Sequence, residues 1–282
     1  MADPLVLTLS CADRPGITAR VTSFLFERGG NILEAQQFND RSSDAFFMRV
    51  EFDPGEASRE MIRTEFAPIA AEHGMDWKLA LRDRPRRVLI MVSKFDHCLS
   101  DLMYRQAQGE LDMEITAIVS NHRDLRPMAE REGIRFVYLP VTKETKAKQE
   151  AALMDIVEET GTELVVLARY MQILSDNLCR QLSGRAINIH HSFLPGFKGA
   201  KPYHQAHTRG VKLIGATAHY VTSDLDEGPI IDQEVQRVNH TYRPEDLVAV
   251  GRNTETIALS RAVKYHLEHR IFLDQNKTVI FQ

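Results

Sequence analysis

The hydrophobic pattern of this sequence changes its period at a short charged segment, residues 83–87, and this change constrains the fold more than any other feature. Before it, residues 4–81 follow the order β-α-β-β-α-β, which is typical of a ferredoxin-like module. After it, continuous apolar runs such as Val88–Val92 alternate with helical patterns, as in a doubly wound, mostly parallel α/β sheet. The segment itself, Asp83-Arg84-Pro85-Arg86-Arg87, has the charge and proline of a linker. We therefore predict two α/β domains, residues 1–83 and residues 84–282.

The expected elements follow from period, apolar runs and turn residues. In the first domain we expect strands over residues 4–10, 31–38, 45–52 and 75–81, a helix from Ile17 to Gly29-Gly30, and a helix over residues 58–73. In the second we expect strands over residues 88–92, 115–119, 135–138, 164–167, 186–189, 214–221 and 230–238, and helices over residues 99–108, 125–132, 146–159 and 244–269.

Composition excludes several classes of protein. Lys and Arg number 35 against 39 Asp and Glu, a net charge of -4, which argues against binding nucleic acid by neutralising phosphates. The apolar runs are far shorter than the ~20 residues that span a bilayer, and the first residues lack the pattern of a signal peptide. The cysteines, Cys11, Cys98 and Cys179, are too scattered for a disulfide framework or a metal cluster. We expect a reduced, cytoplasmic protein with neither nucleic-acid nor membrane partners.

A polar segment, Asn188–Pro195, directly follows the strand expected at residues 186–189. Ligands of open α/β sheets bind at the carboxyl ends of the strands. Asn188 and His190 are two residues apart, so on an extended backbone their side chains point to the same side. We expect the amide and the imidazole to face one pocket, although a polar strand end with a locally satisfied histidine would give the same sequence.

A second segment, His219–Pro229, holds three acidic residues within four positions, Asp224, Asp226 and Glu227. Such clusters are usually solvated turns. Carboxylates also suit hard cations, but the spacing is not that of a calcium loop, so we expect no metal here. A third segment, Leu167–Leu174, follows another strand, and its apolar residues fit a core as well as a pocket.

Taken together, these segments resemble the folate-dependent formyltransferases. The family pattern Asn-x-His…Leu-Leu-Pro…His-x-Val-Thr…Asp-x-Gly-Pro is matched in order by Asn188–His190, Leu194-Pro195, His219–Thr222 and Asp226–Pro229. Residues 168–174 are similar to the family's folate-cleft segment and residues 118–121 to its second strand, so the resemblance covers about residues 86–282. In the first domain, Asp13–Ile17 and Gly30–Ile32 resemble an ACT domain. An ACT domain followed by a formyltransferase-like domain is the arrangement of the formyltetrahydrofolate deformylase family.

One departure favours a hydrolase over a transferase. Phosphoribosylglycinamide formyltransferases have a Gly-x-Gly-Ser-Asn turn after their first strand, and such a turn holds the phosphate of the acceptor through backbone N–H groups. Here the segment is Ser93–Leu99, which has no glycine and carries Phe95 and Asp96. Without the phosphorylated acceptor, water is left as the nucleophile.

The resemblance implies hydrolysis of 10-formyltetrahydrofolate to formate and tetrahydrofolate, which would supply formate for one-carbon and purine metabolism. It implies that Asn188 and protonated His190 stabilise the oxyanion, that His190 also delivers a proton to the folate nitrogen, and that Asp226 orients or deprotonates the water. His219 would support these residues without touching substrate, and no metal or other cofactor is expected. His191 stands where synthetic transferases usually have proline, so its role is open. The implied substrate-binding residues are Met171, Ile173, Leu174, Val221, Thr222 and Asp224.

The ACT resemblance implies a small amino-acid effector, with glycine and methionine as the candidates, and a homo-oligomer, for which we expect a tetramer. We expect effector contacts from Asp13 and Gly16 in the first turn and from Asn31 and Ile32, taken to begin the next strand beside it. The alternative is that residues 13–16 form only a tight turn.

Three other functions remain to be weighed. The first is formyl transfer to phosphoribosylglycinamide, against which Phe95 and Asp96 argue. The second is a non-catalytic sensor of amino acids or folate, against which the complete set of Asn188, His190 and Asp226 argues. The third is a nicotinamide dehydrogenase, which lacks support because no Gly-x-Gly-x-x-Gly follows Val88–Val92.

Overall fold

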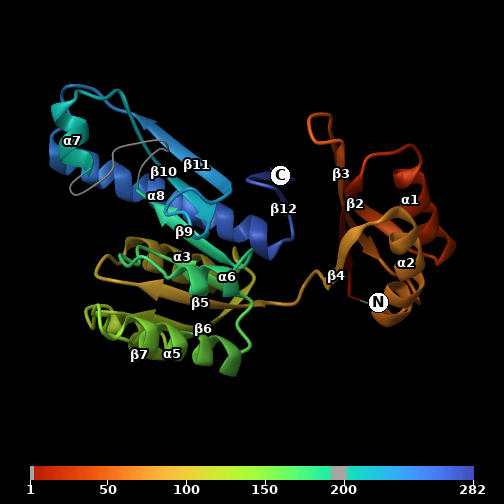
Figure 1. Cartoon of the computed structure of the whole chain (residues 1–282), viewed down its shortest axis with the longest axis horizontal. Helices are drawn as coiled ribbons and strands as arrows, with labels where there is room; N and C mark the ends of the chain where they lie inside the picture. Colours follow the sequence, from red (N-terminus) through yellow and green to blue (C-terminus); the bar gives the residue numbers. More distant parts are fainter. Residues whose placement is uncertain (1–2, 192–201) are drawn as a thin grey trace. The chain divides into compact units, whose positions relative to one another are not determined.

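The computed structural model describes residues 3–191 and 202–282, which form two compact units (Figure 1). The first unit contains residues up to Arg84 together with two C-terminal segments, Glu268–Phe272 and Val279–Gln282. The second contains Pro85–Leu267 and Leu273–Thr278. The expected division near residue 84 did not include the return of the C-terminal segments to the first unit.

The first unit is a four-stranded antiparallel sheet with two helices, in the chain order β-α-β-β-α-β that the sequence predicts. Its strands lie in the order β2-β3-β1-β4, so β2 and β4 are the edges. Their bounds are β1 Leu5–Ala12, β2 Asn31–Asp40, β3 Ala45–Asp53 and β4 Asp76–Leu81, and the helices are α1 Ile17–Glu27 and α2 Arg59–His73.

The two faces of this sheet are covered by different parts of the chain. On one face, the buried side of α1 packs with α2 and with alternate strand residues into a core that includes Phe24, Phe52 and Phe66. On the opposite face, Phe47 packs against Phe272 and Phe281 of the C-terminal segments. The alternation of strand side chains explains why Phe47 and its neighbours in β3 point to different cores.

A buried arginine joins the C-terminal segments to this second face. Arg49 is 2% exposed, forms ion pairs with Glu34 and Glu51, and donates a hydrogen bond to the backbone oxygen of Glu268. Arg270 also pairs with Glu34. These paired charges and the aromatic contacts explain why Glu268–Phe272 and Val279–Gln282 belong to the first unit.

The second unit is a seven-stranded sheet in the order β11-β10-β9-β8-β5-β6-β7. The pairs from β9 to β7 are parallel, whereas β10 and β11 are antiparallel additions. The doubly wound, mostly parallel fold predicted from the sequence is therefore confirmed. The strands are β5 Arg86–Val92, β6 Met113–Ser120, β7 Phe136–Tyr138, β8 Leu164–Leu167, β9 Ala186–His190, β10 Leu213–Tyr220 and β11 Ile230–Arg237.

Helices cover this sheet, and the longest, α8 Pro244–Leu267, packs against β9, β10, β11 and α3. The others are α3 His97–Ala107, α4 Arg126–Arg131, α5 Lys146–Glu159, α6 Asp176–Gln181 and α7 Pro202–Thr208. Strands β12 Ile271–Asp274 and β13 Lys277–Ile280 pair with each other. Among the described residues, no helix is long and apolar enough to cross a membrane.

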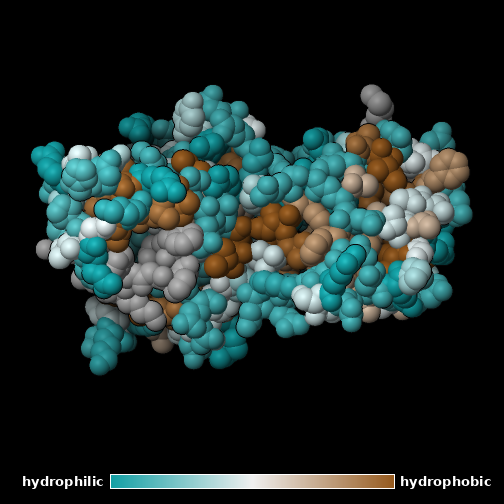
Figure 2. Space-filling view, turned by 90° about the horizontal axis from the view of Figure 1, so that it is seen from above, coloured by the Kyte–Doolittle hydropathy of each residue, from teal (hydrophilic) through white to brown (hydrophobic). Residues whose placement is uncertain are grey.

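Some large apolar side chains lie on the surface of the first unit. Leu33 and Phe38 on the edge strand β2 are 52% and 44% exposed, and Phe26 on α1 is 80% exposed. The face drawn in Figure 2 is mostly hydrophilic, with hydrophobic residues gathered in a few patches. Among the described residues β2 pairs with no strand except β3, so these exposed side chains lie on an edge strand of the sheet.

Candidate active site

A cavity opens in the second unit where β8 and β9 end and the β10–β11 connection begins. This is the edge at which ligands of open α/β sheets bind. All ten expected catalytic, supporting and folate-contact residues line it, namely Met171, Ile173, Leu174, Asn188, His190, His219, Val221, Thr222, Asp224 and Asp226. The expected Leu194-Pro195 element lies outside the described residues.

Strand pairing places the polar side chains. Asn188 and His190 share one face of β9, and the antiparallel neighbour β10 sets His219 directly opposite Asn188. The register of β10 against β11 shifts between Ala218 and His219, where the pairing becomes irregular at the mouth of the cavity. Three segments that are distant in sequence thus meet at one point.

Asp226 pairs with His190 and lies near His219. Its Oδ2 lies 3.2 Å from Nδ1 of His190, and its Oδ1 lies 3.8 Å from Nε2 of His219. Burial would raise the pKa of Asp226, but the hydrogen bond from His190 and the nearby histidines outweigh burial and lower it below the ordinary value. Asp226 is therefore a carboxylate at neutral pH and holds the Nδ1 side of His190, so Nε2 of His190 is left for the substrate.

His219 is a neutral imidazole whose tautomer follows from its contacts. Burial lowers its pKa, and its Nδ1 lies 2.9 Å from the backbone oxygen of Tyr220, to which it must donate. Its Nε2 is then an acceptor, and the Asn188 amide nitrogen lies 3.3 Å from it. One amide hydrogen of Asn188 is used in this contact, which leaves the second for another acceptor.

The loop that carries Asp226 is held by close backbone packing. Tyr220 donates a backbone hydrogen bond to the oxygen of Pro229, and a Cβ at Gly228 would overlap the Tyr220 backbone oxygen. Glycine is therefore required at position 228. Asp226 itself has a φ of 59°, in the left-handed region that costs a residue with a side chain about 1–2 kcal/mol. Strain of this kind concentrates at functional sites.

His191, whose role the sequence leaves open, is neutral and stacks on the catalytic candidate beside it. Its ring centroid lies 5.0 Å from that of His190 at an interplanar angle of 29°. Burial, with the charge of Arg169, lowers the pKa of His191 from 6.5 to about 4. The ring of His191 therefore supports that of His190 by packing and not by charge.

The wall formed by residues 168–175 is anchored by buried polar groups. Gln149 donates to the Tyr170 hydroxyl, Ser93 Oγ accepts from the Met171 backbone N–H, and Glu150 accepts from both the backbone and the hydroxyl of Ser175. Between these anchors, Met171 and Ile173 are 50% and 61% exposed. The apolar residues of this segment therefore line a surface that a flat ring could cover, and they are not all core.

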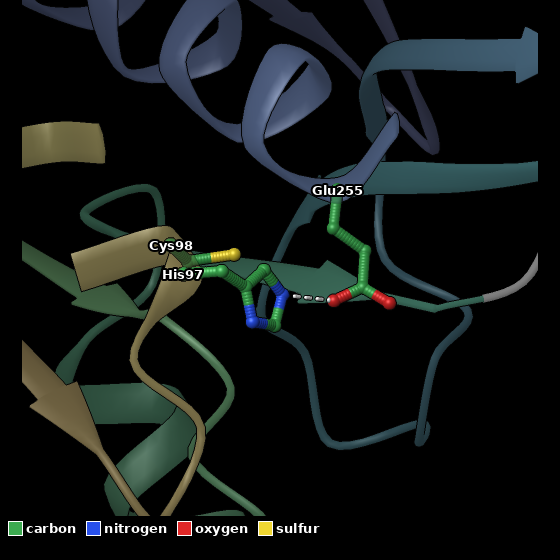
Figure 3. A group of neighbouring side chains, drawn as sticks. All are labelled: His97, Cys98 and Glu255. Atoms are coloured by element: carbon green, nitrogen blue, oxygen red, sulfur yellow. Dashed lines mark hydrogen bonds and ion pairs between the residues drawn. The ribbon is translucent and has the colours of Figure 1, made fainter. Parts of the chain in front are cut away.

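Sequence reasoning missed Arg169, which also lines the cavity. It is 9% exposed, has a φ of 66°, and pairs with Glu255. Figure 3 shows Glu255 with its neighbours His97 and Cys98. Nothing in the sequence shows that Glu255, on α8, would reach the end of β8.

The four expected effector residues do not lie together within a single chain, so the expected adjacency of the two segments was wrong, whereas their role in binding an effector stays a prediction. Strands β1 and β2 are both antiparallel to β3, so they run parallel to each other. Asp13 and Gly16 follow the end of β1, whereas Asn31 and Ile32 lie at the start of β2, at the opposite end of the sheet. Eight strand residues separate the two ends by roughly 25 Å.

The turn itself has its own geometry. Asp13 accepts a hydrogen bond from Asn39, and Gly16 has a φ of 94° immediately before α1. A Cβ at Gly16 would meet no atom within 4 Å, so the backbone angle and not a close approach requires glycine there.

Comparison with known proteins agrees with this geometry. The sequence matches the formyl transferase family over residues 86–263 and the ACT domain family over residues 5–61. A formyltetrahydrofolate deformylase of Corynebacterium sp. (strain P-1) is 53% identical over 279 residues, 98% of each chain. The crystal structure of formyltetrahydrofolate deformylase from Burkholderia mallei superposes with a TM-score of 0.96 at 53% identity, over 100% of both chains. Glycinamide ribonucleotide transformylase 1 of Symbiobacterium toebii is more distant, with a TM-score of 0.66 at 26% identity over 73% of this chain and 98% of its own. The chain therefore belongs to the formyltetrahydrofolate deformylase family.

Proposed function

We propose that this protein hydrolyses 10-formyltetrahydrofolate to formate and tetrahydrofolate in the cavity of the second unit. The observation that carries the proposal is the convergence of Asn188, His190 and Asp226, with the 3.2 Å contact between His190 and Asp226 at its centre. An amide donor, an imidazole and an ionised carboxylate are the groups that water attack on an amide-like carbonyl needs.

The three groups divide the steps of the mechanism between them. Asp226 orients the water and accepts its proton as oxygen attacks the formyl carbon. Asn188 and His190 donate hydrogen bonds to the oxyanion that forms. As the carbon–nitrogen bond breaks, His190 delivers a proton to the folate nitrogen, and formate leaves with one oxygen from water. The reaction consumes one water and releases one proton when formic acid ionises.

The folate ring would lie on the exposed apolar residues of the 168–175 wall, mainly Met171 and Ile173. The Val221–Asp224 loop forms the facing side and offers backbone groups for the pterin edge. Leu174 and Thr222 complete this set of contacts.

The segment Ser93–Leu99 supports water over a phosphorylated acceptor. The Phe95 ring lies with its centroid 5.2 Å from the Arg169 guanidinium carbon, and His97 donates to Glu255. Side chains thus occupy the start of α3, where a phosphate-binding turn would present bare backbone N–H groups. A transferase function would need these side chains to move.

The proposal includes no metal, because Asp226 and His190 supply the base and the acid. We also place the enzyme in the cytoplasm, as a source of formate for one-carbon and purine metabolism.

The first unit would act as a regulatory and assembly domain. The ACT match supports an amino-acid effector, with glycine and methionine as the candidates. Since Asp13 and Asn31 lie at opposite ends of the sheet, an effector that touched both would need two chains. The exposed Leu33 and Phe38 on the edge strand support homo-oligomer formation, with a tetramer as the proposed state.

The test of the main proposal is an assay of formate and tetrahydrofolate released from 10-formyltetrahydrofolate, with and without phosphoribosylglycinamide. Equal formate release under both conditions supports the hydrolase. Product formation only with the acceptor would show a transferase, and folate binding without turnover would show a sensor.

A further inference from the structure

Arg169 occupies a backbone position that suits glycine. It lies two residues after the end of β8 and has a φ of 66°, which costs a residue with a side chain about 1–2 kcal/mol. Arg169 lines the cavity, its side chain is nine-tenths buried, and the Phe95 ring lies beside its guanidinium group. A strained backbone that keeps a buried charge in a substrate cavity points to a function of that charge.

Glu255 is the counter-charge of this arginine. It lies on α8, is 1% exposed, and its Oε2 lies 3.3 Å from Nε of Arg169 without hydrogen-bond geometry. His97 donates to the same oxygen at 2.7 Å, as Figure 3 shows, and Tyr203 donates to Oε1 at 3.0 Å. Burial would raise the pKa of Glu255, but the bond from His97 and the charge of Arg169 lower it, so the group is an anion.

The helix is shaped to admit one of these donors. Gly251 lies one turn before Glu255 on α8, and a Cβ there would overlap the hydroxyl and ring of Tyr203. A glycine inside a helix costs about 1 kcal/mol relative to alanine. This glycine lets Tyr203 cross the helix and reach the carboxylate.

These contacts argue against a cation at this group, although one donor atom each of His97, Cys98 and Glu255 lies within 4.8 Å of the others. The guanidinium of Arg169 already balances the carboxylate. Burial, with the charge of Glu255, raises the pKa of the Cys98 thiol well above its ordinary value, so the thiolate that a soft metal needs is disfavoured.

We propose that Arg169 stabilises the negative charge that develops on the formyl oxygens in the cavity, and that Glu255 is the positioning residue that holds Arg169 in place for this task. The inference rests on the proposed hydrolysis, whose oxyanion and formate product are both anionic. Arg169 lines the same cavity as His190 and His191. Its positive charge acts on His191, the ring stacked on His190, so its field reaches the proposed reaction centre.

Steady-state kinetics of Arg169→Met and Glu255→Gln test this proposal. Loss of one donor that stabilises an oxyanion costs about 10²–10³ in kcat. We expect Arg169→Met to lower kcat about 100-fold with KM within about threefold of the wild type, and the inhibition constant for added formate to rise about tenfold. Glu255→Gln should change the same quantities in the same direction, with a kcat loss of about tenfold. Because the glutamate acts through the arginine, the double variant should be no more than about threefold slower than Arg169→Met alone.

Glu245→Gln is the matched control, since it is the same substitution at an exposed position of the same helix. It should retain wild-type kinetics. If Glu255→Gln fails to fold, Tyr203→Phe removes a single hydrogen bond to the carboxylate and should lower kcat about threefold without a change in KM.

Two results would overturn the inference and are distinguishable. If the wild-type enzyme releases formate and Arg169→Met retains the wild-type kcat and formate inhibition, the role proposed for Arg169 and Glu255 is wrong and the proposed hydrolysis stands. If the wild-type protein releases no formate, the proposed hydrolysis is wrong as well.

Discussion

His190 and Asp226 form the contact on which the proposed chemistry depends, with Nδ1 of His190 3.2 Å from Oδ2 of Asp226. The histidine comes from a sheet strand and the aspartate from a loop 36 positions later. The contact fixes the imidazole so that its Nε2 is presented to a ligand in the cavity, beside the Asn188 amide. The pairing therefore links the acid of the mechanism to its base.

The Asp226→Asn variant isolates the charge of this pair. Asparagine tolerates the left-handed backbone at this position, so the loop should keep its shape. We expect kcat to fall by about 10²–10⁴, because the variant lacks the general base. Folate affinity should stay unchanged, because asparagine has the same shape as aspartate. Stopped-flow turnover together with calorimetry of tetrahydrofolate binding would measure both. A turnover rate near that of the wild type would show that Asp226 is an acidic residue of the loop without a catalytic role.

Gly228→Ala should disturb the same carboxylate through the backbone. The added Cβ would overlap the Tyr220 oxygen, so the loop must shift and carry Asp226 away from His190. We expect at least about a tenfold loss of kcat with the fold retained, since a small displacement of a catalytic group is enough. Gly109→Ala is the control, because a Cβ there would meet no atom within 4 Å, so its cost comes from a φ of 73° and not from an overlap. Equal activity of the two variants would show that the loop position is not critical.

The partly buried His191 should make stability depend on pH. The unfolded chain takes up its proton near pH 6.5, whereas the folded state does so only near 4. The unfolded state therefore binds more protons in this window, so stability falls as pH drops from about 6.5 to about 4, by up to about 3 kcal/mol. His191→Phe keeps a ring beside His190 and removes the titration. The difference in melting temperature between variant and wild type should shift in favour of the variant as pH falls from 7 to 4.5, and a constant difference would contradict the prediction.

Chelation should leave turnover intact, because Asp226, His190 and Asn188 supply the base, acid and donor. Dialysis against a strong chelator, followed by the formate assay and metal analysis of the protein, would measure this. A loss of activity that one divalent ion restores would show that a carboxylate or thiol of the cavity region binds metal.

Helices and strands with a clear hydrophobic period could be predicted from the sequence, whereas elements of only a few residues were missed. The helix expected at residues 146–159 and the strand at 164–167 coincide with α5 and β8, because each has a clear apolar pattern. The six-residue helix α6 and the pair β12–β13 were missed, since short elements leave little periodicity. Ser175, whose hydroxyl caps α6 by accepting from Leu178, was the signal that could have located that helix.

Spatial relationships between elements were harder to predict than the elements. The cavity residues could be predicted because motifs at strand ends converge by topology. The placement of Asn31 beside Asp13 was wrong because both strands pair with β3 in the same direction, so their starts share one end of the sheet. The pairing of Arg169 with Glu255 depends on how α8 packs over the sheet, which no local pattern records.

The most direct test of the account is hydrolysis of 10-formyltetrahydrofolate in water enriched in ¹⁸O, with phosphoribosylglycinamide present, followed by mass spectrometry of the products. If water is the nucleophile, the formate carries one ¹⁸O atom and the acceptor stays unformylated. Formylated phosphoribosylglycinamide without labelled formate would contradict the hydrolase and identify a transferase.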